Sequence, residues 1–167
     1  SYDLNRETYN GELTLSRFPL DRFLTVDSLG SASANFRLEG RYFSWPQAKT
    51  SVNAGIRQLF YKEHEYKDIT LQATLDKTHL RGTMVSKDPD APLDLVFRGD
   101  SLQQQYQVGL GGYIGKVDLQ ALHLMQEPLT MGLKVDLQGF IGEHSAYALK
   151  ARFDSLSMAD SRKTYTL

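Results

Sequence analysis

The amino-acid sequence predicts a mainly β protein, built as an elongated antiparallel meander sheet with two short helical turns. Apolar and polar residues alternate with a period of two along most of the chain, as in strands with one buried and one wet face. Turn-forming residues separate the alternating runs, and most links are too short for a crossover helix. With 167 residues, 41% of them hydrophobic and 23% charged, the chain fits one ordinary domain.

Seven runs carry the clearest alternation. In the first, Ala32, Ala34, Phe36 and Leu38 occupy every second position. The same pattern returns in residues 52–56, 69–75, 93–97, 106–110, 129–137 and 147–153, and weaker versions occupy residues 9–15, 80–86 and 156–167. Each run has one apolar face, which is typical of an antiparallel sheet with water on one side.

The connections are consistent with this sheet. Turn chemistry is found at Gly40, Asp76-Lys77, Asp88-Pro89-Asp90, Gly99-Asp100 and Gly142-Glu143. Two segments are predicted to be helical turns. Residues 18–24 have Pro19 in a first-turn position, and residues 117–125 have Asp118 as an N-cap candidate.

An internal repeat links the two halves of the chain. A shift of 99 residues places Phe36 on Val135, Leu38 on Leu137 and Gly40 on Gly139 without a gap. Each unit, at about residues 11–60 and 110–160, reads as a helical turn followed by an alternating strand. Repeated sheet units indicate an elongated array. Because the chain opens on Ser1, we expect residues 1–167 to be a single β-sheet fragment of a longer protein.

Composition excludes several classes of function. Lys and Arg total 19 against 20 Asp and Glu, which argues against a nucleic-acid partner because such binders carry a basic excess. The absence of cysteine excludes disulfides and thiolate chemistry. The longest uncharged stretch, residues 101–115, contains three consecutive Gln and four Gly, so it is no match for the roughly 20 apolar residues of a membrane-spanning helix.

No catalytic, cofactor or metal site is predicted. His64, His79, His123 and His144 have no metal-ligand spacing. His64, between Glu63 and Glu65, is expected in a solvated loop at residues 62–68, with a weak divalent-ion contact there as the alternative. Asp88, Asp90 and Asp94 are expected to flank a solvated turn. The glycine-rich residues 109–116 have Ile114 where the dinucleotide fingerprint needs glycine, which favours a strand.

Two candidate binding surfaces remain. Trp45 lies in an aromatic patch at residues 41–46, which suits strand-edge packing or, as an alternative, a carbohydrate platform. The second candidate is the apolar face of the sheet. It is a filled core if the sheet closes as a β-sandwich binding module for carbohydrate or protein, and a groove if the sheet stays open. The residues expected to line it are Phe36, Leu38, Val52, Ile56, Leu71, Leu95, Phe97, Val108, Leu133, Val135 and Leu137.

The sequence resembles a known family. Residues 17–40, RFPLDRFLTVDSLGSASANFRLEG, are similar to the repeated segment of the TamB family, the inner-membrane component of the translocation and assembly module. Residues 53–76 and 116–139 fit the same pattern. The chain looks most like the Bacteroidetes-type branch, in which Phe-Pro-Leu, a pair of Leu and Ser-Leu-Gly recur; here Phe-Pro-Leu is at residues 18–20 and Ser-Leu-Gly at residues 28–30.

The resemblance implies both a fold and a function. TamB belongs with AsmA-like and bridge-like lipid-transfer proteins, in which the sheet curls into an open U-shaped trough, a β-taco, with an apolar interior. These periplasmic proteins of Gram-negative bacteria are anchored in the inner membrane and reach an Omp85-type outer-membrane barrel. The expected partners are phospholipid acyl chains or outer-membrane protein client strands, and the expected role is non-enzymatic.

Overall fold

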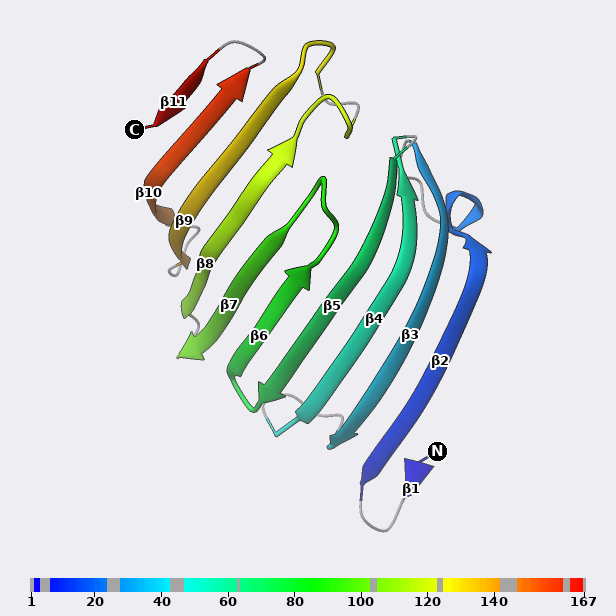
Figure 1. Cartoon of the computed structure of the whole chain (residues 1–167). Coiled ribbons are helices and arrows are strands. Elements are labelled where there is room, and N and C mark those ends of the chain that lie inside the picture. The colour runs from blue at the N-terminus through cyan, green and yellow to red at the C-terminus, as the bar shows by residue number, and fades with distance from the viewer. Residues whose placement is uncertain are drawn as a thin grey trace.

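The computed structural model describes residues 2–3, 7–23, 28–42, 47–62, 64–102, 105–122, 125–141, 147–160 and 163–166. These residues form one sheet of eleven strands, and every pair of neighbours is antiparallel and consecutive in the chain. Figure 1 shows the sheet as one open layer, with β1 at one edge and β11 at the other. The predicted antiparallel meander is confirmed, and the sheet is not closed into a barrel.

The two edge strands, β1 and β11, are very short, and between them the strands are long except in the middle of the sheet. The central pair, β6 and β7, have 8 and 10 residues, whereas most of the flanking strands have 12 to 14. The bounds are β1 Tyr2–Asp3, β2 Thr8–Pro19, β3 Leu29–Arg41, β4 Lys49–Tyr61, β5 His64–Asp76, β6 His79–Ser86, β7 Leu93–Leu102, β8 Gln105–Asp118, β9 Leu129–Ile141, β10 Tyr147–Asp160 and β11 Thr164–Thr166.

The helical predictions are only partly right. A three-residue 3-10 helix, η1 (Leu20–Arg22), follows β2 within the first predicted segment. The second prediction is wrong in its first half, because Val117 and Asp118 end β8 and only a turn follows over residues 119–122. Gly40 and Gly99-Asp100 lie inside β3 and β7 rather than in turns, because these strands continue past the last alternating residue.

A line of irregular pairing, here called the bulge line, crosses the sheet near one end of the strands. The register shifts between Leu15 and Phe18 in β2. It shifts again between β3 and β4, where Arg57 of β4 is the extra residue. On the far side it shifts between Ile114 and Val117 in β8 and between residues 154 and 157 in β10. Each bulge inserts one residue, so the apolar positions step by three instead of two and stay on one face.

The central strands β6 and β7 are short, so the sheet has a gap between β5 and β8 beyond the bulge line, here called the notch. The loop after β6, residues 87–92, occupies the notch. On one side, the Lys87 N–H donates to the Asp68 carbonyl of β5. On the other side, the Gly115 N–H donates to the Pro92 carbonyl at 2.7 Å and the Asp118 N–H to the Asp90 carbonyl at 3.1 Å. The loop therefore joins the two halves of the sheet in place of strand pairing.

The chain exposes more surface than a compact protein of its size. Its accessible area is 11828 Å², whereas a folded monomer of 18.9 kDa is expected to expose about 8,300 Å². The difference of roughly 3,500 Å² follows from the single-layer architecture. The β-sandwich alternative is therefore not what the described residues form.

Candidate functional site: the apolar face of the sheet

The strand pairings align apolar residues into continuous rows across the sheet. Phe36 pairs with Ala54, which pairs with Leu71, and the row continues in the same way through every long strand. This central row consists of Leu13, Phe36, Ala54, Leu71, Met84, Leu95, Gly112, Val135 and Phe153. Residues paired across strands lie on the same face, so the central row is one apolar stripe from edge to edge.

Three further rows run beside the central row on the same face, because side chains two positions apart on a strand point the same way. With the central row they form the surface here called the apolar face. Their residues are Leu15, Ala34, Ile56, Ile69, Ser86, Leu93, Ile114 and Leu133; Gly11, Leu38, Val52, Ala73, Gly82, Phe97, Leu110, Leu137 and Ala151; and Tyr9, Gly40, Thr50, Leu75, Leu80, Gly99, Val108, Gly139 and Leu149.

All eleven residues expected to line a groove lie on this face. Ile56 and Leu133 are in the row next to the bulge line, and Phe36, Leu71, Leu95 and Val135 are in the central row. The others are further from the bulge line: Leu38, Val52, Phe97 and Leu137 in the next row, and Val108 in the last. The pairing places them together on one surface, while their contact with lipid stays a prediction.

The apolar face is dense in the middle of the sheet and exposed toward its ends. Leu95 and Val135 are only 7% and 6% exposed. Toward the outer strands and the far row, Val108 is 46% exposed and Phe153 60%. Large apolar side chains that meet water on one contiguous face are typical of an interaction surface.

Aromatic side chains on this face lie over glycines in the neighbouring strand. The Phe97 ring occupies the place where a Cβ on Gly82 would stand, and the Tyr9 ring does the same at Gly40. Glycine at these positions therefore leaves the space that the ring atoms occupy close to the backbone.

The opposite face of the sheet is polar. Its middle row contains Glu12, Arg37, Asn53, Gln72, Thr83, Val96, Gly111, Asp136 and Arg152. Arg37 donates two hydrogen bonds to Glu12; these hydrogen bonds, and then the Glu12 charge, raise the Arg37 pKa. A hollow of about 490 Å³ lies over β2–β5, lined by polar residues such as Thr14, Asn35 and Gln72 together with Phe36 and Ala54.

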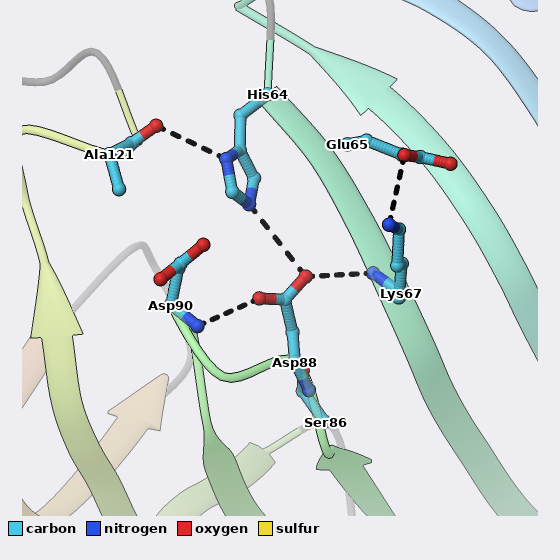
Figure 2. A network of polar contacts seen from close by, with 7 residues as sticks. All are labelled: His64, Glu65, Lys67, Ser86, Asp88, Asp90 and Ala121. Atoms are coloured by element: carbon cyan, nitrogen blue, oxygen red, sulfur yellow. Dashed lines mark hydrogen bonds and ion pairs between the residues drawn. The ribbon is translucent and has the colours of Figure 1, made fainter.

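A polar cluster lies beyond the bulge line, in the notch. His64 begins β5, and its Nδ1 lies 3.1 Å from the Ala121 carbonyl oxygen. Its Nε2 lies 3.7 Å from Asp88 Oδ2, which also accepts the Lys67 N–H at 2.8 Å (Figure 2). Asp88 Oδ1 accepts the Asp90 N–H at 2.9 Å.

This cluster corrects two predictions. Asp88 is 2% exposed rather than solvated, and His64 lies in a strand rather than in a loop. Burial by its neighbours and the Asp88 charge both raise the pKa of Tyr66, whose ring meets the His64 ring edge-on. The sequence could not indicate the cluster, because 24 residues separate His64 from Asp88.

Beside the polar cluster lies a small buried core. Ala91, Val117 and Leu122 form it, with Tyr66 and Leu119 packed against it. The core joins β5, the loop after β6 and the turn after β8, so it lies at the notch.

A second His–Asp pair is exposed at the other end of the strands. His79 Nδ1 lies 2.6 Å from Asp100 Oδ1, which Arg81 also contacts at 2.8 Å. Hydrogen bonds from His79 and then Arg81 lower the pKa of Asp100. The His79 side chain is half exposed, so the pair differs from the His64 cluster in burial and serves as a comparison for it.

The remaining sequence predictions divide into three groups. The glycine-rich residues 109–116 lie in β8, which confirms the strand prediction. Trp45, His123 and His144 lie outside the described residues. Among the described residues, no helix is both long and apolar enough to span a membrane.

Bulges also recur at the 99-residue spacing of the internal repeat. The shift between Leu15 and Phe18 in β2 recurs 99 residues later between Ile114 and Val117 in β8. Positions 36 and 135 fall in the same row of the apolar face, as do positions 38 and 137. The two predicted units thus place equivalent residues at equivalent heights on the sheet.

Comparison with family models, curated proteins and solved structures gives no significant match for this chain. The functional argument therefore rests on the geometry and chemistry of the apolar face.

Proposed function

We propose that the apolar face binds lipid acyl chains, and that the chain is a segment of a hydrophobic conduit that moves phospholipid toward an outer membrane. The observation that carries the proposal is the apolar face itself, which crosses a single open sheet and has no second layer of described residues over it. Each CH₂ group buried there contributes roughly 0.8 kcal/mol. The polar face keeps the other side of the sheet in water.

The resemblance to the TamB family agrees with this proposal. In that setting the chain is an internal periplasmic segment of a Gram-negative bacterium, and inner-membrane anchoring and docking to an Omp85-type barrel belong to other parts of the protein. Transfer of lipid along an apolar surface needs no nucleophile, cofactor or metal, so the proposed role is not enzymatic.

Open sheet edges favour a second candidate function, assistance to outer-membrane protein client strands. Along β2, the described partner β1 pairs only with Thr8 and Tyr9, and along β10 the partner β11 pairs only with Ser157–Ala159. Unpaired strand edges are templates for an added strand. A client strand could pair there while its apolar side chains rest on the apolar face.

Two valines on opposite faces give a matched test. Val108 is on the apolar face and 46% exposed, and Val96 is on the polar face and 52% exposed. Native mass spectrometry with solvent extraction would measure the phospholipid that each purified variant retains. We expect Val108→Asp to lower retained phospholipid at least about tenfold, because a carboxylate is costly in an apolar site, and Val96→Asp to leave it unchanged. Equal retention by both variants, or none by the parent, would refute lipid binding at this face.

A further inference from the structure

We infer that His64, Asp88 and Asp90 form a binding site for a borderline divalent cation such as Zn²⁺, which would clamp the notch. The inference is independent of lipid binding, because the cluster lies beyond the bulge line, away from the four rows of the apolar face. One ligand atom from each of the three residues lies within 4.8 Å of the others.

The first argument is the state of the His64 imidazole. If Nδ1 carries the proton and donates it to the Ala121 carbonyl oxygen 3.1 Å away, Nε2 presents a lone pair. Nε2 is buried and has no hydrogen-bond partner among the described residues. A backbone carbonyl that holds the other ring nitrogen is the usual outer partner of a metal-binding histidine.

The second argument is the carboxylate that Nε2 faces. With the proton on Nδ1, Nε2 and Asp88 Oδ2 are two electron-rich atoms that face each other in a buried place, 3.7 Å apart and too far for a hydrogen bond. A cation between them removes this repulsion. A separation of 3.7 Å is close to the roughly 3.4 Å between two ligands of one tetrahedral zinc ion, given zinc–ligand distances of about 2.0–2.1 Å.

The third argument is charge. Asp88 is nearly fully buried. The Lys67 side chain does not neutralise it, because the Lys67 ammonium pairs with Glu65 at 3.0 Å. The backbone N–H groups of Lys67 and Asp90 hold the Asp88 carboxylate in place, but they do not neutralise its negative charge. The Asp90 carboxylate, which lies beside the His64 ring in Figure 2, accepts no hydrogen bond from the described residues. A divalent cation would neutralise both carboxylates.

The ligand set points to the class of cation. One imidazole nitrogen and two carboxylate oxygens suit zinc and neighbouring transition metals, whereas calcium and magnesium prefer oxygen ligands alone. The cation would tie β5 to the loop after β6, and His64 would extend the tie to the turn at Ala121. The joint between the two halves of the sheet would then depend on metal.

Calorimetric titration of the untagged, EDTA-treated protein with zinc chloride tests the site, alongside thermal unfolding with and without zinc. We expect one equivalent to bind and to raise the unfolding temperature. His64→Ala and Asp90→Asn should each weaken binding roughly tenfold or more. His79→Ala is the matched control, because it removes a histidine from the exposed His79–Asp100 pair, and it should bind zinc like the parent.

Asp90→Asn keeps the test decisive if His64→Ala folds poorly, because the Asp90 backbone N–H that holds Asp88 remains. Absence of zinc binding to the folded parent would overturn the inference. Binding that His79→Ala abolishes and Asp90→Asn leaves intact would also overturn it, since the zinc would then occupy the exposed pair.

Discussion

Gly112 is the residue where the backbone of the sheet is most constrained. Its φ of +143° is one that side-chain-bearing residues rarely adopt, and a Cβ there would overlap the Asp94 carbonyl oxygen of β7. Gly112 stands in the central row between Leu95 and Val135. The backbones of β7 and β8 approach each other closely at this point, which leaves no room for a side chain at position 112.

Substitution of this glycine gives a prediction at the residue scale. Gly112→Ala should lower the free energy of unfolding by about 2 kcal/mol or more, because it adds both backbone strain and a clash with main chain. Gly111→Ala is the control, since a Cβ at Gly111 comes no closer than 3.8 Å to the Val135 carbonyl oxygen. Urea unfolding measures both. Equal midpoints for the two variants would contradict this view of Gly112.

Individual residues also mark the limit of what the sequence could predict. The alternation of Phe36 and Leu38, or of Val52 and Ile56, correctly predicted strands and the side on which they lie, because period two is a local property. The His64 cluster depends on a loop, a strand and a turn that meet only when eleven strands are assembled. No local spacing carries that information, and Asp88 was consequently expected in water.

At the scale of the strands, the bulge line is the main departure from regular alternation. Asp68 in β5 has a φ of +50°, and its carbonyl oxygen accepts the Lys87 N–H, so the bulge in β4 continues as a left-handed residue in β5. The two-residue alternation breaks at such points. In β4 the inserted Arg57 makes Leu59, three positions after Ile56, the next apolar residue of the pattern. This is why strand ends were predicted less well than strand centres.

Asp68 provides a test of the bulge line. Asp68→Val should lower the free energy of unfolding by roughly 1–2 kcal/mol, because a β-branched residue is disfavoured at positive φ. Asp68→Gly should keep or slightly raise it, since glycine adopts this conformation freely. Thr70→Val, two residues further along β5 in regular strand, is the matched control and should be nearly neutral. Urea midpoints ordered with Asp68→Val above Asp68→Gly would contradict a left-handed residue here.

The repeat belongs to the same scale. Sequence similarity across 99 residues rests on apolar residues that any amphipathic strand shares, so it was weak evidence by itself. The bulges at Leu15/Phe18 and Ile114/Val117 are independent of that similarity, since they are features of backbone pairing. They give the two units a common irregularity as well as a common pattern.

At the scale of the whole molecule, the sheet has a packed joint and an open surface. The buried core and the polar cluster both lie in the notch, where the loop after β6 joins the halves. The apolar face is crowded near Leu95 and Val135 and exposed toward the outer strands. A large exposed apolar surface is typical of a site that a partner covers, and acyl chains are the proposed cover.

The most direct test of this proposal is photo-crosslinking from the two faces. A benzophenone side chain placed at Val108 or at Val96, in protein exposed to phospholipid vesicles, would capture what lies against each face. Phospholipid adducts at Val108 and none at Val96 are the result that the proposal predicts. Equal labelling at both positions, or no lipid adduct at Val108, would contradict it, and adducts to protein alone at Val108 would favour the client-strand function instead.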